Sequence, residues 1–211
     1  MPGTHAFKPV VQRLIRPFAR ALAKAGISAN QVTVAGGALS ISVGILLLLS
    51  RDTRWFLLLP AALITRMALN AVDGVLAREF AQETRLGVYL NELGDAVSDV
   101  FLYLPFAHLP GFSPFWIWNV VVAAVISELT GTVAVMAGAS RRYEGPMGKS
   151  DRALVFGALA LCVGVAGGLP EWLCNVLPKV LVSLLLATIV NRVRGGLNET
   201  DAVKGNDYAP M

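Results

Sequence analysis

The stretch NAVDGVLAREFAQETRLGVYLNELGDAVSD, residues 70–99, decides how this chain folds. It lies where two apolar segments of membrane-spanning length approach each other, yet it carries several acidic and amide side chains. These are Asn70, Asp73, Asn91, Glu92, Asp95 and Asp99. A carboxylate at bilayer depth is costly, so an acid there is by default a candidate functional group. We therefore expect the rest of the chain to act as a scaffold for these polar residues.

The composition indicates a single polytopic membrane domain. Hydrophobic residues make up 55% of the 211 residues, charged residues 15%, and the mean hydropathy is +0.61. A soluble domain is nearer ~45–50% apolar. The basic residues occupy short connecting stretches and form no continuous stripe, which argues against nucleic-acid binding despite a net charge of +4. Cys162 and Cys174 lie in apolar surroundings without metal-like spacing, so we interpret them as inert thiols, and we expect no cleavable signal peptide.

The pattern of apolar segments predicts an all-α fold with six transmembrane helices and an N-terminal amphipathic interfacial helix. A bilayer core requires segments of about 17–25 residues. Six such segments are expected over residues 32–50, 55–77, 86–109, 115–139, 153–168 and 172–193. Basic and apolar residues alternate at helical spacing near the N-terminus, as in a helix lying on anionic lipid; a helix packed on the domain is the alternative. The single domain 1–211 then comprises a juxtamembrane helix over 8–26, a bundle over 32–194 and a polar tail over 195–211.

The distribution of Lys and Arg predicts the orientation in the membrane. Fourteen of the 18 lie on one side of the predicted spans, whereas the opposite side has only Arg51 and Arg54. Because positive residues favour the cytoplasmic side, both termini are expected there. The polar ends of the second and third spans then face the cytoplasm. We expect an integral protein of a bacterial inner membrane.

The polar side chains of these two spans present oxygen ligands to each other. Asn70 and Asp73 share one helical face, and Asn91, Asp95 and Asp99 recur at steps of four. Carboxylate and amide oxygens suit hard divalent cations such as Mg²⁺, Mn²⁺ or Ca²⁺. Small residues that allow close approach, and cations that could hold phosphates, lie nearby: Gly74, Ala77, Gly87, Arg78, Arg85, Lys149 and Arg152. Together they predict phosphoryl transfer on a lipid-linked diphosphate.

The stretch resembles the signature of the CDP-alcohol phosphotransferase family, D-x2-D-G-x2-A-R-x8-G-x3-D-x3-D. Six of its eight fixed positions match at the required spacing. The eight positions are Asn70, Asp73, Gly74, Ala77, Arg78, Gly87, Asn91 and Asp95. Residues 30–33 and 148–149 resemble two further elements of the family, and the six predicted spans fit it.

The resemblance implies that an alcohol hydroxyl attacks the β-phosphoryl group of a CDP-linked lipid, CDP-diacylglycerol, and releases CMP. It implies one or two Mg²⁺ or Mn²⁺ ions, with Asp95 as general base and as a ligand beside Asn70, Asp73 and Asn91. The implied contacts to the CDP-lipid are Asp73, Gly74, Ala77, Arg78 and Gly87, with Thr84 and Arg85 as weaker candidates. It also implies a homodimer formed through the membrane helices, in contact with membrane lipids.

The two amides are departures from the family pattern. Asn70 and Asn91 stand at the first and third aspartate positions, so the formal ligand charge falls from −4 to −2. Three outcomes stay open: a single metal ion, a second ion held by Glu92 or Asp99, or an inactive relative. The competing interpretation of Asp99 is an ion pair with Arg66 inside the bundle.

Candidates for the acceptor or its phosphate are Arg66, Lys149 and Arg152. Arg66 has pairing with Asp99 or Glu128 as its alternative role. Glu128 either lines an acceptor cavity or makes an interhelical hydrogen bond. The basic loop after the fourth span favours a phosphorylated acceptor such as glycerol 3-phosphate or an inositol phosphate, with glycerol or another polar alcohol left open. The second hypothesis is a catalytically inactive membrane protein that binds CDP-lipid or a cation.

Overall fold

The computed structural model describes residues 8–207, and the side chains of residues 15–201. Every regular element in this part of the chain is helical, so the predicted all-α class is confirmed. The elements are α1 Lys8–Lys24, α2 Ala29–Leu49, η1 Thr53–Leu57, α3 Leu58–Glu79, α4 Arg85–Tyr103, η2 Leu104–His108, α5 Pro114–Met136, α6 Lys149–Ala166 and α7 Glu171–Asp207.

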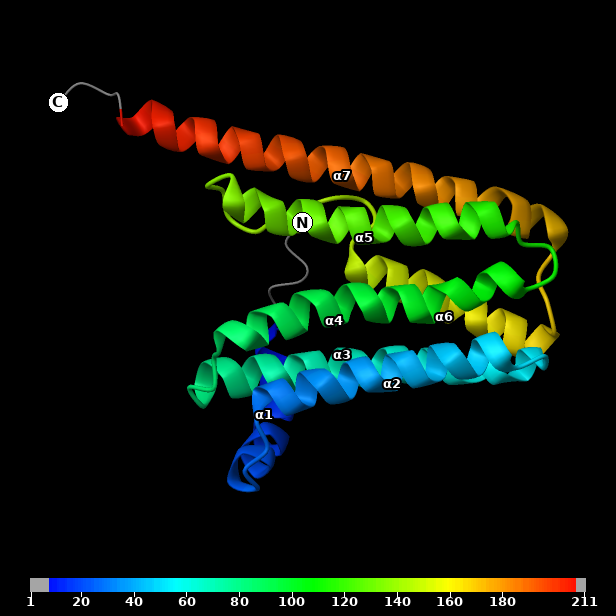
Figure 1. Cartoon of the computed structure of the whole chain (residues 1–211), viewed down its shortest axis with the longest axis horizontal. Helices are drawn as coiled ribbons and strands as arrows, with labels where there is room; N and C mark the ends of the chain where they lie inside the picture. Colours follow the sequence, from blue (N-terminus) through cyan, green and yellow to red (C-terminus); the bar gives the residue numbers. More distant parts are fainter. Residues whose placement is uncertain (1–7, 208–211) are drawn as a thin grey trace.

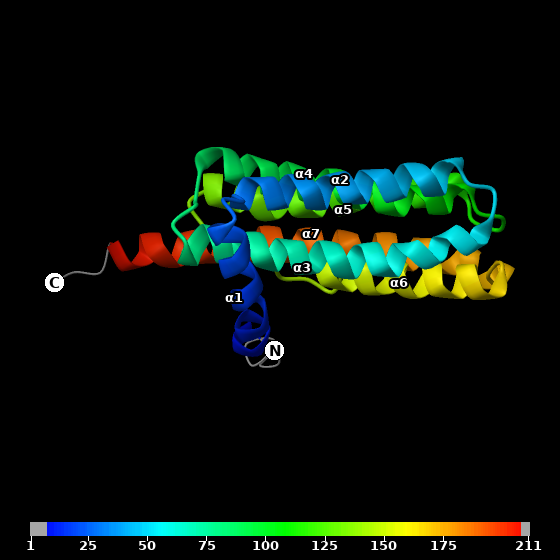
Figure 2. The same cartoon turned by 90° about the horizontal axis from the view of Figure 1, so that it is seen from below.

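Helices α2 to α7 run side by side along one axis (Figure 1). Seen from below, α2, α4 and α5 form one layer and α3, α6 and α7 the other (Figure 2). Helix α2 packs on α3 and α4, α5 packs on α4 and α7, and α3 packs on α6. Helix α1 runs across one end of this bundle and packs on α3.

Four segments are long and apolar enough to cross a membrane: Ala29–Leu49, Thr53–Glu79, Pro114–Met136 and Glu171–Asp201. Helices α4 and α6 lie parallel to them, but each carries charged residues within its length. The span count of six therefore stays a prediction. Large apolar side chains such as Ile64, Leu93 and Val165 are exposed around the bundle, as a lipid-facing surface requires.

The boundaries differ from the sequence expectation in three places. Helix α4 ends at Tyr103 because Pro105 follows and η2 begins, and α6 begins at Lys149, four residues early. Helix α7 continues to Asp207, so the segment predicted as a polar tail from residue 195 is helical up to that point. Contacts of Glu199 with the loop after α5 hold this extension in place. Residues 1–7 and 208–211 lie outside the described part of the chain.

The core brings α2 and α4 together at the end of the bundle opposite the polar stretch. In its centre Tyr103 stacks on Phe156, with ring centroids 4.0 Å apart. At Gly44 the backbones of α2 and α4 come so close that an added Cβ would lie 2.3 Å from the carbonyl oxygen of Phe101. Glycine is the residue that allows this approach, which packs the C-terminal half of α2 against the C-terminal half of α4.

Candidate active site

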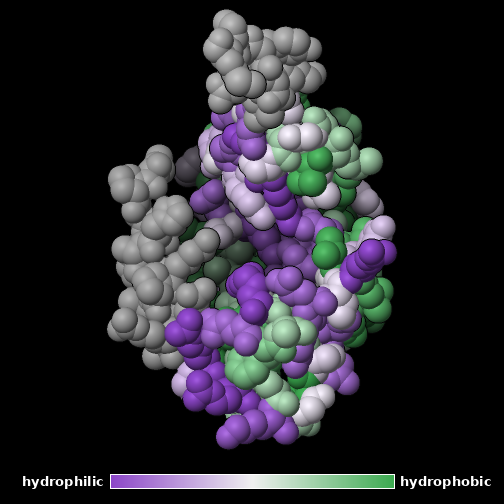
Figure 3. Space-filling model, turned by 90° about the vertical axis from the view of Figure 1, so that its left-hand side faces the viewer, coloured by the Kyte–Doolittle hydropathy of each residue, from purple (hydrophilic) through white to green (hydrophobic). Residues whose placement is uncertain are grey.

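A cavity of about 410 Å³ lies between α2, α3, α4 and the turn that joins α3 to α4. It is at the polar end of the bundle, where hydrophilic side chains gather around a hollow (Figure 3). We call it the large cavity. Its lining residues are Ala29, Asn30, Thr33, Asn70, Asp73, Gly74, Ala77, Arg78, Gln82, Glu83, Thr84, Gly87, Val88 and Asn91.

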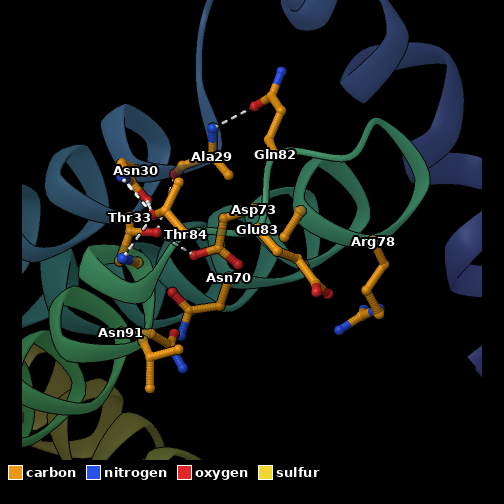
Figure 4. A pocket seen from close by; sticks show the side chains of 14 residues that line it. Ala29, Asn30, Thr33, Asn70, Asp73, Arg78, Gln82, Glu83, Thr84 and Asn91 are labelled. Carbon is orange, nitrogen blue, oxygen red and sulfur yellow. Dashed lines mark hydrogen bonds between the residues drawn. The ribbon is translucent and has the colours of Figure 1, made fainter.

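Asp73 supplies a buried carboxylate to the large cavity. The Oγ1 atom of Thr33, on α2, donates a hydrogen bond of 2.7 Å to its Oδ2 atom. Asn70 lies one turn earlier on α3, and Asn91 reaches the same cavity from α4 (Figure 4). The structure therefore brings together three of the predicted metal ligands, as the helical spacing of the two spans required.

The turn between α3 and α4 is tied to the start of α2. The backbone N–H of Ala29 donates to Gln82 Oε1 at 2.7 Å, and Asn30 Nδ2 donates to Thr84 Oγ1 at 3.1 Å. Thr84 also caps α4 by accepting from the N–H of Gly87 at 2.9 Å. A Cβ at Gly87 would lie 2.7 Å from Asn30 Oδ1, so a larger residue there would disturb this wall.

Arg78 is exposed and extends the lining toward the mouth of the cavity (Figure 4). Its guanidinium group lies back over Gly74, where an added Cβ would meet Nη2 at 2.8 Å. This arrangement explains why a glycine stands four residues before the arginine. Arg85, predicted as a weaker contact, lies outside the residues that line the cavity.

Asp95 lies between the large cavity and a smaller pocket, and cations occupy both of its oxygens. Oδ1 accepts from Arg66 Nη2 at 2.9 Å and from Asn70 Nδ2 at 3.0 Å, and Oδ2 pairs with Lys149 Nζ. The smaller pocket measures about 160 Å³ and we call it the α3/α6 pocket. It is lined by Leu63, Arg66, Met67, Asn70, Lys149, Ser150 and Ala153.

Two residues predicted for the site belong instead to the bundle interior. Asp99 is 3% exposed, and it pairs with Arg66 Nη1 at 2.8 Å and Arg152 Nη2 at 2.8 Å. This corrects its assignment as a metal ligand, because its oxygens face arginines; its pairing with Arg66, the competing interpretation, is confirmed. Arg152 is 1% exposed and also pairs with Glu128 at 2.9 Å. Because Asp99 and Glu128 hold its guanidinium group inside the bundle, it is not placed to hold a ligand phosphate.

The donor set of the large cavity fits a divalent cation. Among the described residues no group of three or more His, Cys, Asp or Glu side chains is arranged to hold a metal ion. Within the large cavity Asp73 and Glu83 offer carboxylates, and Asn70 and Asn91 offer amide oxygens. One carboxylate with neutral oxygens and substrate phosphates is a sufficient set for Mg²⁺. Asp95 and Asp99, the two further acids expected to hold a metal ion, already pair with protein cations.

The chain matches a known protein family over most of its length. The profile of the CDP-alcohol phosphatidyltransferase family matches residues 27–191, which includes every residue that lines the two cavities. This chain belongs to the CDP-alcohol phosphatidyltransferase family.

Relatives of this phosphatidyltransferase cover most of its length. It is 44% identical over 195 residues to the inner membrane protein YnbA of Escherichia coli strain K12, covering 92% of this chain and 96% of that protein. It is 26% identical over 193 residues to the phosphatidylinositol phosphate synthase of Mycolicibacterium smegmatis, covering 86% and 82%. Among solved structures, the Mycobacterium tuberculosis phosphatidylinositol phosphate synthase with CDP-DAG bound superposes with a TM-score of 0.70. The two are 20% identical over 87% of this chain and 94% of that one, which establishes the shared fold.

Sequence reasoning missed the residues that position the site. Thr33 had been noted only as part of a family element, yet it holds Asp73. Glu92 was a candidate second metal ligand, but it pairs with Arg141 and accepts from Thr132 Oγ1 at 3.2 Å. Arg192 had no assigned role, and it lies buried against Glu128. These contacts join residues about 40 or more positions apart, on different helices. The spacing of residues within one helix therefore cannot predict them.

Proposed function

We propose that this chain transfers the phosphatidyl group of CDP-diacylglycerol to a small polar alcohol and releases CMP. The observation that carries the proposal is the large cavity, which combines the carboxylate of Asp73, the amides of Asn70 and Asn91, and the guanidinium of Arg78. Oxygen ligands for a cation and a cation for phosphate are what a nucleoside diphosphate requires. The shared fold with a synthase solved with CDP-DAG bound supports this reading.

The reaction is a substitution at the phosphorus that carries diacylglycerol. The acceptor oxygen forms a new bond to this phosphorus, the bond to the bridging oxygen breaks, and CMP leaves with the electron pair. We assign the acceptor proton to Asp95 Oδ2. A carboxylate oxygen has two lone pairs, so Oδ2 can take this proton while Lys149 Nζ stays paired with it. Arg66 and Asn70 keep Oδ1 in place. Arg66 and Asn70 thus orient the base.

The cation in this proposal is a single Mg²⁺ or Mn²⁺ held by Asp73, Asn70 and Asn91. When bound, it would neutralise the diphosphate and the charge that develops on the leaving group. A structure of the Mycobacterium tuberculosis synthase in complex with manganese and citrate, 18% identical with a TM-score of 0.70, shows that a protein of this fold takes such an ion. Of the three outcomes that the two amides left open, we propose the single ion.

The proposal places the large cavity and both termini on the cytoplasmic side of a bacterial inner membrane, with α2 to α7 as six spans. Helix α1 runs across the bundle end nearest the large cavity, as a helix in the membrane interface would, and Arg16 pairs with Glu79 of α3. The homodimer stays an expectation taken from the family.

The deciding experiment is CMP release from CDP-diacylglycerol by the purified protein in lipid nanodiscs. Acceptor alcohols are screened in Mg²⁺, Mn²⁺ and EDTA. We expect metal-dependent release that Asp73→Asn abolishes, and Asp95→Asn should abolish turnover while CDP-diacylglycerol still binds. If the nucleotide lipid binds but no acceptor and no metal yields CMP, the inactive lipid-binding protein is the correct reading.

A further inference from the structure

The α3/α6 pocket has the size and position of an acceptor site. It shares Asn70 with the large cavity. Its other polar lining residues are Ser150 and the two cations bound to Asp95, Arg66 and Lys149. A molecule held there lies next to the proposed base. Its volume of about 160 Å³ equals roughly five water molecules, at ~30 Å³ each. That space suits an alcohol of about three carbons.

The cations of this pocket are already neutralised. Arg66 is 4% exposed, and its two terminal nitrogens pair with Asp95 at 2.9 Å and Asp99 at 2.8 Å. Lys149, the more accessible of the two, pairs with the second oxygen of Asp95. Neither group brings an uncompensated positive charge to the pocket.

Basic and acidic side chains also pair with each other in the part of the bundle behind the pocket. Six cations and six anions there form ion pairs in two sets, a larger one around Asp95, Asp99 and Glu128 and a smaller one around Arg142. We call the twelve residues together the ion-pair cluster. Its members are Arg66, Arg141, Arg142, Lys149, Arg152 and Arg192 with Glu92, Asp95, Asp99, Glu128, Glu144 and Glu199. The basic loop that favoured a phosphorylated acceptor in the sequence is therefore electrically neutral in the fold.

A phosphate monoester brings a charge of about −1.5 to −2 into a pocket whose cations already pair with Asp95 and Asp99. Either this charge stays uncompensated, or the phosphate displaces one of the two carboxylates from its cation. Removing one partner from a buried ion pair leaves an uncompensated charge, which is strongly unfavourable. A hydroxyl group imposes no such cost, because it donates to Asp95 or Ser150 and accepts from Lys149 without displacing charge. The pocket thus discriminates between the two acceptor classes.

We propose that the acceptor is an uncharged polyol of about three carbons, bound in the α3/α6 pocket, and that phosphorylated alcohols are rejected. The inference rests on the proposed phosphatidyltransferase activity and names the substrate class of that site. It replaces the phosphorylated acceptor expected from the count of basic residues in the loop after α5.

The test compares glycerol with glycerol 3-phosphate as acceptors for CMP release, with radiolabelled acceptor recovered in the lipid product. We expect kcat/KM to be at least 100-fold higher for glycerol, and glycerol 3-phosphate to compete poorly with it. Faster transfer to glycerol 3-phosphate overturns this inference and leaves the proposed activity standing. Release with neither acceptor, nor with any other alcohol in the screen, overturns both.

A charge variant tests the physical cause. Glu128→Gln removes one anion from the ion-pair cluster, where Glu128 serves Arg152, Arg192 and Arg141. We expect the ratio of kcat/KM for glycerol 3-phosphate over glycerol to rise at least 10-fold. Glu171→Gln, at the opposite end of α7, is the matched control and should leave the ratio unchanged. An unchanged ratio in folded Glu128→Gln contradicts the electrostatic argument. If that variant does not fold, the comparison of glycerol with glycerol 3-phosphate in the wild-type protein decides the acceptor class.

Discussion

Replacing Arg152 by alanine tests whether this side chain stabilises the bundle or binds a ligand. Its Nη2 donates to Asp99 at 2.8 Å and to Glu128 at 2.9 Å, and its Nε donates to Asp99 at 3.2 Å. Removing one partner of a buried ion pair costs about 3–5 kcal/mol. Asp99 keeps Arg66, so we expect the lower end, about 3 kcal/mol. At ~2–4 °C per kcal/mol for a chain of this size, Tm falls by about 6–12 °C.

The assay is thermal unfolding in a fixed detergent, followed by circular dichroism, with acceptor kinetics measured on the same preparations well below Tm. Arg152→Lys keeps the charge but loses the planar fork, so its Tm should fall less. Arg194→Ala removes an exposed arginine from the same helix end as Arg192 and should leave Tm within about 1 °C. An unchanged Tm for Arg152→Ala, together with a 10-fold higher acceptor KM, would refute the structural role.

Three further outcomes follow from single contacts. Gly44→Ala places a Cβ 2.3 Å from a backbone oxygen of α4, so it should lower the free energy of unfolding by about 2 kcal/mol and Tm by ~4–8 °C. The control is Gly37→Ala, whose Cβ meets nothing within 4 Å and which should raise Tm slightly. Thr33→Val removes the hydrogen bond to Asp73 and should weaken Mn²⁺ binding about 10-fold in a calorimetric titration, as loss of a partner that orients a ligand does elsewhere. The same titration should give one ion per chain for the wild type and none for Asp73→Asn; two ions would contradict the single-ion proposal.

Much of the fold followed from local pattern. The six long helices appear where apolar periodicity predicted them. A helix that packs against the bundle on one face and contacts lipid on the other needs apolar residues on both, and this composition can be read within a single segment. The limits of α4 and α6 did not follow. Both helices carry charged residues, which interrupt the apolar pattern in the sequence. In the bundle these residues pair across the two helices, Lys149 with Asp95 and Arg152 with Asp99.

The candidate site divides in the same way. Asn70, Asp73 and Asn91 converge on one cavity because fixed helical spacing put them on facing sides of adjacent helices. The ion pairs of Asp95 and Asp99 could not be predicted in this way, because their partners lie on other helices.

The sequence by itself determined the helical membrane class, the family signature and the placement of oxygen ligands on two neighbouring helices, since each is encoded in local composition and spacing. Only the tertiary structure decided the charge of the site. An excess of basic residues in one loop says nothing of where their partners lie, and here those partners come from α4, α5 and α7. Electrostatic energy depends on distance in space, so the pairing that makes the acceptor pocket neutral exists only in the folded bundle.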